Sequence, residues 1–263
     1  MTNQIERATL FNSFHTAGDP LILFNAWDAG TAKAAEEAGS KAIATGSYAV
    51  AMANGFEDGE NVPLEFALAN LTRIVRSVDL PVTLDFEGGY AVDGDGLATN
   101  IKSVITTGAI GINFEDRVVQ GEGLYTIEQQ SDRIRTVRKA ADETGVPLYI
   151  NARCDVVLPL DTSTHTETHL EEMIVRAKAY AEAGASGFFA PGLVNPAFIE
   201  RLCKESPMPV NILVWPGVPS SGTLADLGVA RISYGGGSYR MTMEAFKQAN
   251  RKALEWKHSE QNN

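Results

Sequence analysis

Cysteine and long apolar runs are scarce in this sequence of 263 residues. Two cysteines, Cys154 and Cys203, are too few for a disulfide framework, so we expect reduced thiols and a cytoplasmic protein. No apolar run approaches the roughly 20 residues that cross a bilayer. The first twenty residues also lack the basic start and apolar stretch of a signal peptide. These absences argue against a membrane protein and against a secreted, disulfide-rich one.

Positive charge is also in short supply. The chain has 22 Lys and Arg against 33 Asp and Glu, which gives a formal net charge of −11. Binding to nucleic acid depends on clustered Lys and Arg that neutralise phosphates, and an anionic membrane surface attracts the same residues. We therefore expect neither nucleic acid nor a membrane as a partner. The excess of acidic residues is typical of a protein that stays in solution.

The sequence does contain a regular alternation of short apolar runs and longer amphipathic segments, which indicates β/α units around a parallel sheet. Eight strands are predicted, at residues 21–25, 41–45, 82–86, 111–115, 148–153, 187–190, 210–214 and 230–234. The predicted helices are 29–38, 64–77, 97–106, 127–143, 167–183, 196–205, 223–226 and 241–256. The count and the length predict one (β/α)8 TIM barrel domain over residues 1–263. A doubly wound sheet is the alternative, but it suits fewer strands, and no GxGxxG follows the first one.

Acidic residues stand where two neighbouring strands end, which is where barrels of this kind place their active sites. Asp85 and Glu87 end the third predicted strand, and Glu115 ends the fourth. Three carboxylates close together repel one another, and a divalent cation would remove that repulsion. Oxygen ligands without His or Cys favour Mg²⁺, or Mn²⁺, over Zn²⁺. The alternative is that each carboxylate caps a helix or pairs with Arg117 or Arg153.

Other polar residues at strand ends are candidates for binding an anion. The guanidinium of Arg153 can grip a carboxylate or phosphate, although it could instead pair with Glu115 or Asp116. Backbone N–H groups of Gly46 and Ser47 could face an anion at a turn. Further candidates are Asn211 on the seventh strand and the run 234–238, which is either a phosphate-binding loop or a flexible turn.

Six segments that contain these residues together resemble the isocitrate lyase/phosphoenolpyruvate mutase superfamily. They follow one another in order on the predicted strands and span most of the chain. The segments are NAWDAG (25–30), TGS (45–47), GFED (55–58), DFEGGY (85–90), NFED (113–116) and NAR (151–153).

The resemblance implies a barrel whose last helix is exchanged between subunits of a homodimer or homotetramer. It implies substrates that are small 2-oxo or 2-hydroxy carboxylic acids, which pass through a metal-stabilised enolate. It also implies roles for residues of this chain: Mg²⁺ held partly through water by Asp85, Glu87 and Glu115, a substrate carboxylate bound by Thr45, Gly46 and Ser47, an anionic group bound by Arg153, and an acidic residue near the pocket at Asp58.

The sequence departs from the family pattern in two places. Residues 118–125 read VVQGEGLY, without the Cys, Lys and His that the lyases carry in this loop or the Lys of the mutases and phosphonopyruvate hydrolases. The sixth strand ends in Ala190-Pro191, without the His of the mutases. The loop sequence argues against a true isocitrate or methylisocitrate lyase, and the missing Lys and His together argue against phosphonate chemistry.

The prediction is therefore a Mg²⁺-dependent lyase that cleaves a C–C bond of a small 2-oxo or 2-hydroxy dicarboxylate, by decarboxylation or by retro-aldol cleavage. Polarising the 2-oxo group and taking up enolate charge demand little of the protein's own acids and bases. The candidates for proton transfer are Tyr48, Asp58, Glu122 and Tyr125. The alternatives are a phosphonopyruvate-type P–C hydrolase or mutase and a catalytically silent barrel that only binds a metabolite.

Overall fold

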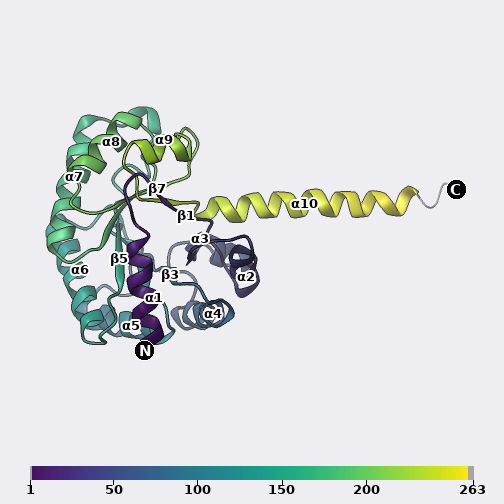
Figure 1. Cartoon of the computed structure of the whole chain (residues 1–263), viewed down its shortest axis with the longest axis horizontal. Helices are drawn as coiled ribbons and strands as arrows, with labels where there is room; N and C mark the ends of the chain where they lie inside the picture. The colour runs from purple at the N-terminus through teal and green to yellow at the C-terminus, as the bar shows by residue number, and fades with distance from the viewer. Residues whose placement is uncertain (1, 260–263) are drawn as a thin grey trace.

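The computed structural model describes residues 2–259, with side chains described from 4 to 255. Eight parallel strands form one sheet in the order β1-β8-β7-β6-β5-β4-β3-β2, with helices on its outside (Figure 1). This arrangement confirms the predicted (β/α)8 barrel. The strands are β1 (Leu21–Leu23), β2 (Ile43–Ala44), β3 (Val82–Asp85), β4 (Gly111–Glu115), β5 (Tyr149–Arg153), β6 (Gly187–Ala190), β7 (Val210–Leu213) and β8 (Arg231–Ser233).

The barrel closes between β1 and β2 just beyond the ends of both strands. Ala26 forms a parallel bridge with Thr45. The amide of Ala26 donates to the carbonyl oxygen of Ala44 at 2.8 Å, and the amide of Gly46 donates to that of Ala26 at 3.3 Å. The segment that contains Thr45 and Gly46 is therefore tied to the barrel rim on both sides.

All eight predicted strands are present, and most are one to three residues shorter than predicted. The missing residues lie at either end of a strand: β2 lacks its first two predicted residues and β5 its first, whereas β1 lacks its last two. The helices are α1 (Thr2–Ser13), α2 (Ala29–Glu37), α3 (Ser47–Ala53), α4 (Leu64–Ser77), α5 (Gly94–Thr106), α6 (Ile127–Asp142), α7 (Glu167–Glu182), α8 (Pro196–Glu205), α9 (Ser221–Asp226) and α10 (Gly236–Ser259), with a 3₁₀ turn η1 (Thr162–Thr164).

Two helices, α1 and α3, have no counterpart among the predicted elements. Helix α3 starts directly after Gly46, and its seven residues are shorter than a pattern-based prediction can resolve. Helix α1 precedes the first strand, and Gln4 fixes it by donating to the carbonyl oxygens of Ile105 and Ala109 at 2.9 and 2.8 Å. Neither helix alters the predicted order of β/α units.

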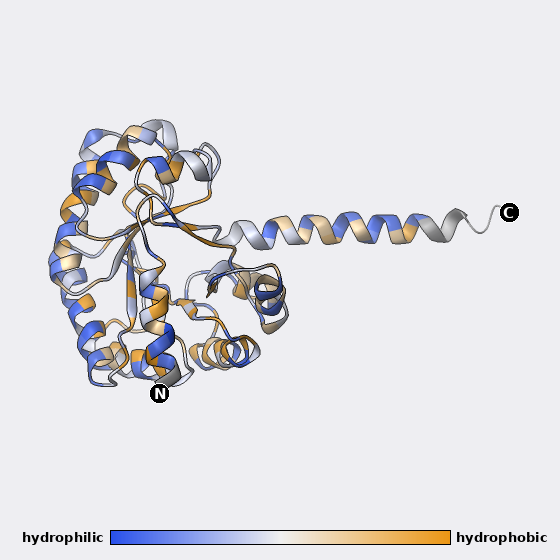
Figure 2. Ribbon diagram, in the orientation of Figure 1, coloured by the Kyte–Doolittle hydropathy of each residue, from blue (hydrophilic) through white to orange (hydrophobic). Residues whose placement is uncertain are grey.

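The apolar core lies between the sheet and the surrounding helices, whose sequences alternate between hydrophobic and hydrophilic residues (Figure 2). The inside of the barrel is more polar. Arg231 is fully buried there, and its Nη2 donates to Oδ1 of Asn113 at 3.2 Å. Asn151 Nδ2 donates to the same oxygen at 2.9 Å, which turns the Asn113 Nδ2 group toward Asp85. The polar interior thus leads directly to the predicted site.

Helix α10 extends away from the barrel over most of its length (Figure 1). Met241, Phe246 and Leu254 are 59%, 67% and 58% exposed, so these apolar side chains do not pack against the barrel. Near the start of the helix, Tyr239 and Met243 do pack against the buried side chains of Trp27, Ala49 and Val50. The predicted exchange of this helix between subunits stays a prediction, and the side chain of Trp256 lies outside the described residues. None of the helices that the structure describes has the length and apolar character of a membrane span.

Candidate active site

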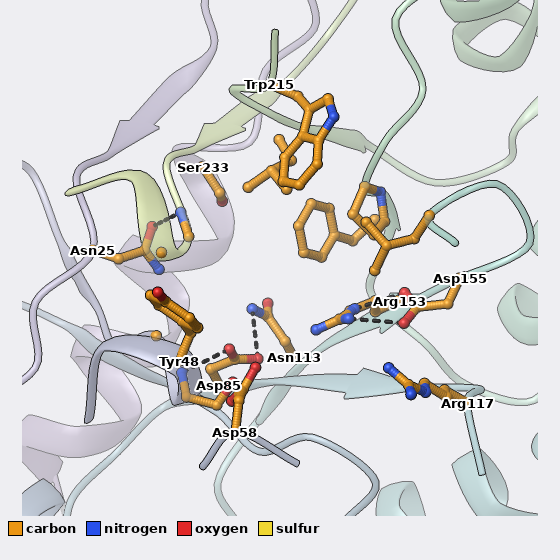
Figure 3. Close-up of a pocket in the computed structure, with 18 of the residues that line it drawn as sticks. Asn25, Tyr48, Asp58, Asp85, Asn113, Arg117, Arg153, Asp155, Trp215 and Ser233 are labelled. Atoms are coloured by element: carbon orange, nitrogen blue, oxygen red, sulfur yellow. Dashed lines mark hydrogen bonds and ion pairs between the residues drawn. The ribbon is translucent and has the colours of Figure 1, made fainter. Parts of the chain in front are cut away.

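A cavity of about 650 Å³ opens at the carboxyl ends of the strands (Figure 3). A second cavity of about 240 Å³ shares four lining residues with it, namely Ser47, Asp58, Arg117 and Arg153. The larger cavity reaches the predicted residues Gly46, Ser47, Tyr48, Asp58, Asp85 and Arg153, and the smaller one reaches Glu87 and Glu115. The tertiary structure therefore brings most of the predicted site residues to one place.

Asp85 is fixed by the turn that precedes α3. The Ser47 amide donates to its Oδ2 at 2.9 Å, and the Asn113 side-chain amide lies 3.4 Å from its Oδ1. The Asp85 amide donates to the hydroxyl of Thr45 at 2.9 Å. Thr45 is buried and does not line either cavity, so the structure places it beneath Asp85 rather than facing the cavity.

Glu87 sits in an unusual stretch of backbone. Its φ of 50° is left-handed, as are those of Tyr90 (56°) and Glu60 (57°), a conformation that costs non-glycine residues energy. Side chains interlock the three residues: the Glu60 amide donates to Glu87 Oε2 at 2.7 Å, and the Tyr90 amide donates to Glu60 Oε1 at 2.8 Å. Strained residues of this kind concentrate at functional sites, where the surrounding structure holds them in place.

Burial and neighbouring carboxylates disfavour the charged forms of Glu87 and Glu115. Burial, together with the charges of Asp85 and Asp58, raises the pKa of Glu87 to about 8. Burial also raises the pKa of Glu115, against the opposing effect of Arg153. Among the described side chains, no three acidic, His or Cys groups are already gathered closely enough to enclose a metal ion. A cation here would therefore need water ligands or a rotation of these side chains.

Arg153 is held from two sides by carboxylates. Its Nε and Nη2 donate to the two oxygens of Asp155, each at 2.7 Å, and its Nη1 lies 2.8 Å from Glu115 Oε2. The two nearby charges raise the pKa of Arg153 despite its burial. Of the two alternative partners predicted for Arg153, Glu115 is therefore present. Asp116 pairs instead with Arg176 at 3.1 Å. Asp155 uses two of the five guanidinium N–H groups, which leaves others for a bound anion.

Besides Thr45, three predicted residues do not line either cavity. Glu122 is exposed near the tip of a loop whose ends are joined by an antiparallel β-bridge between Arg117 and Leu124. This expected proton-transfer residue therefore lies outside the site. Tyr125 packs against the Arg133 guanidinium, whose Cζ lies 4.4 Å from the centroid of the Tyr125 ring. Asn211 is buried inside the barrel, where its Oδ1 accepts from Ser233 at 3.2 Å. In each case the side chain is placed by contacts that position along the chain does not reveal.

In the run 234–238, Tyr234 and Gly235 form a turn after β8, and residues 236–238 begin α10. The amides of Tyr234 and Gly235 donate to Asn25 Oδ1 at 3.1 and 2.7 Å, and the Ser238 hydroxyl donates to the Asn25 carbonyl oxygen. Those two amides already donate to a protein acceptor, so they are not free to bind a phosphate group. Asn25 was part of a matching segment, but its role as the partner of this turn required the folded chain.

The cavity also contains residues that the sequence alone did not single out for it. Arg117 lines both cavities, and none of the described carboxylates forms an ion pair with it. Arg240, in the first turns of α10, lies 5.4 Å from the ring centroid of Tyr48. Apolar side chains line the far side, above all Phe189, Leu213 and Trp215. For these residues the sequence offered one signal, the position of Arg117 just after the predicted strand 111–115.

A β/α barrel with a carboxylate cluster and an arginine around one cavity at its carboxyl-end face has the architecture of an enzyme for small anionic molecules. The family model of phosphoenolpyruvate phosphomutase matches residues 11–254. The chain belongs to this family, and so to the isocitrate lyase/phosphoenolpyruvate mutase superfamily of lyases and mutases for small carboxylates. This confirms the resemblance read from the sequence.

Relatives of known sequence and structure agree with this membership. An uncharacterized protein of Mycobacterium tuberculosis is 32% identical over 92% of this chain and 87% of its own length. The 2-methylisocitrate lyase of Escherichia coli is 27% identical over 92% of this chain and 80% of its own. A crystal structure from Burkholderia cenocepacia J2315, named provisionally as a phosphonomutase, is 44% identical with a TM-score of 0.92, covering 95% and 99% of the two chains.

Proposed function

We propose that this protein is a Mg²⁺-dependent lyase that cleaves a C–C bond of a small 2-oxo or 2-hydroxy dicarboxylate by way of an enolate. The observation that carries the proposal is the meeting of Asp85, Glu87 and Glu115 beside Arg153 around two adjoining cavities. Carboxylates whose charged forms are disfavoured by burial and by one another favour a cation, and a guanidinium next to them favours an anionic substrate.

The donor set suits Mg²⁺, with Mn²⁺ as a substitute, because all of its atoms are oxygens. Asp85, Glu87 and Glu115 would hold the ion, with water completing the shell, since both oxygens of Glu87 already accept from protein groups. The bound ion would act as a Lewis acid that polarises the 2-oxo group and stabilises the charge of the enolate.

The chain's own residues orient the substrate and move protons. Arg153 binds a carboxylate through N–H groups that Asp155 leaves free, while the Ser47 amide holds Asp85 in place beside it. Asp58 lines both cavities, and burial together with the charge of Asp85 raises its pKa. A carboxyl group that keeps its proton more readily suits Asp58 as the acid and base of the reaction, with Tyr48 as the second candidate.

A phosphonopyruvate-type hydrolase or mutase is the second candidate. The 44% identity to a structure named provisionally as a phosphonomutase favours it. The sequence of the 118–125 loop, without Lys, and the Ala190-Pro191 end of β6 weigh against it. A P–C hydrolase would release inorganic phosphate, which a C–C lyase does not.

The deciding experiment follows a panel of acids by NMR with purified protein, in Mg²⁺ and in EDTA. The panel contains 2-oxo acids, 2-hydroxy diacids and phosphonopyruvate, each compared with a protein-free Mg²⁺ control because the metal alone decarboxylates oxaloacetate slowly. Mg²⁺-dependent cleavage of a dicarboxylate supports the proposal. Pyruvate with stoichiometric phosphate would replace it with P–C hydrolysis, and metal binding without any turnover would favour a silent metabolite-binding barrel.

A further inference from the structure

The larger cavity has two chemically different sides. Its polar side holds Asp58, Asp85 and Arg153, and Trp215 lies across the cavity from the two aspartates (Figure 3). All residues that line the cavity between positions 156 and 215 are apolar; they include Leu158, Pro159, Phe189, Pro191, Leu213 and Trp215, which we call the apolar wall. They come from the ends of β6 and β7 and from the loop after β5, so three separate β/α units contribute to one surface.

The apolar wall is built into the fold. Phe189 is only 5% exposed, at the end of β6. Gly235, at a φ of 51°, leaves space for Leu213: a Cβ there would lie 2.9 Å from the Leu213 Cδ1. Gly192, at a φ of 83°, lets the loop after β6 approach Leu158, whose Cα would lie 3.1 Å from an added Cβ. Close packing of this kind gives a preformed surface rather than one that needs a ligand to assemble it.

The size of the cavity exceeds what a four-carbon diacid needs. Cavities of about 300–1,000 Å³ hold ligands of drug size, and this one measures about 650 Å³. The apolar wall offers no charged partner among its described residues for a second or third carboxylate. Burying a carboxylate against it would cost the hydration of the charge without replacing it.

We propose that the substrate dicarboxylate carries a bulky apolar substituent, a branched alkyl chain or an aromatic ring, that packs against the apolar wall. Its carboxylates and its 2-oxo or 2-hydroxy group then meet the polar side of the cavity, at Arg153, Arg117 and Asp85. The inference rests on the proposed function and specifies its substrate class. The polar side binds the reacting acid, and the wall selects the group attached to it. Trp215, which is 37% exposed at the wall, is the specificity-determining residue, because a ligand would cover much of its remaining surface.

The test measures binding of linear 2-oxo acids from pyruvate to 2-oxooctanoate, and of phenylpyruvate, to the full chain in Mg²⁺ by calorimetry. Each methylene buried against the wall should tighten binding about three- to fourfold until the wall is covered. In Trp215→Ala and Leu158→Ala the dependence on chain length should flatten, whereas pyruvate should bind as before. Phe246→Ala is the matched control, because this aromatic side chain is 67% exposed on α10 outside the cavity.

The outcomes separate this inference from the proposed function. Equal affinity for pyruvate and the longer acids would overturn the inference, even if a dicarboxylate is cleaved. An unchanged chain-length dependence in both wall variants would overturn it as well. A steep dependence that both variants lose supports it, and it does so whether or not the NMR panel detects cleavage, because binding is measured without turnover.

Discussion

Arg153 and Asp155 form a two-point ion pair at the end of β5, with Nε and Nη2 of the arginine each 2.7 Å from a carboxylate oxygen. The pair fixes the plane of the guanidinium. The Asp155 amide donates in turn to Asp116 Oδ1 at 2.9 Å, and Asp116 is anchored to Arg176 and Tyr180 of α7. The orientation of the anion-binding group therefore depends on a buried polar network behind the sheet.

Asp155→Asn should lower kcat/KM by about ten- to a hundredfold, because a charged hydrogen-bond partner of Arg153 is lost and the guanidinium can turn further toward Glu115. Steady-state kinetics on whichever acid the NMR panel identifies would measure this. The control is Asp161→Asn, an exposed change near the same loop. Unaltered kinetics in Asp155→Asn would show that the pair does not orient Arg153.

Asp85→Ala should abolish turnover, with a loss of at least about 10²–10³-fold, because it removes the carboxylate that the Ser47 amide and Asn113 hold in the cavity. Calorimetry with Mn²⁺ or Mg²⁺ should show weakened metal binding in the same variant. Asp95→Asn, an exposed change in the first turn of α5, provides the charge-matched comparison. A fully active Asp85→Ala enzyme would remove the basis for the metal assignment.

Tyr180→Phe should lower the free energy of unfolding by about 1–3 kcal/mol, because Asp116 then loses one of its buried hydrogen-bond donors. The Tyr180 hydroxyl donates to Asp116 Oδ2 at 2.8 Å. Urea denaturation measures the change, with Tyr48→Phe as a control, since Tyr48 lines the open cavity. Equal unfolding midpoints for Tyr180→Phe and the parent chain would contradict the role of this network.

His15 should make the protein less stable in acid. Burial, and secondarily the charge of Arg231, lowers the pKa of His15 from 6.5 to about 3. Between these two pH values the unfolded chain binds a proton that the folded chain does not, so stability falls as the pH falls, by up to about 1.4 kcal/mol per pH unit. Above pH 6.5 the ring is neutral in both the folded and the unfolded chain, so His15 causes no loss of stability there.

His15→Phe keeps a ring that can stack on Tyr149, 4.1 Å away between centroids. The variant should lose stability less steeply than the parent chain between pH 6.5 and 3, as measured by denaturation at a series of pH values. The difference between the two chains isolates His15 from the carboxyl groups, whose titration both chains share. Parallel pH profiles would show that the ring is protonated in the folded protein.

The sequence alone was enough for the barrel and for its eight strands. Apolar runs such as 111–115 and 187–190 are long enough, and flanked clearly enough by polar and glycine residues, to be located from local pattern. The same local reasoning placed Asp85, Glu87 and Glu115 at neighbouring strand ends, because the carboxyl ends of parallel strands all lie on one face of a barrel.

The tertiary structure decided which side chains reach the cavity and what they touch. Thr45 follows β2 and Asn211 lies within β7, yet both are buried away from the cavities. Glu122 stands in the expected loop but is exposed outside the site, since each placement depends on neighbours far away in the chain. The apolar wall shows this dependence on distant neighbours more clearly, because Phe189 and Trp215 look like ordinary core residues in the sequence. Only closure of the barrel brings separate β/α units around one space, and contacts between distant segments carry no local sequence signal.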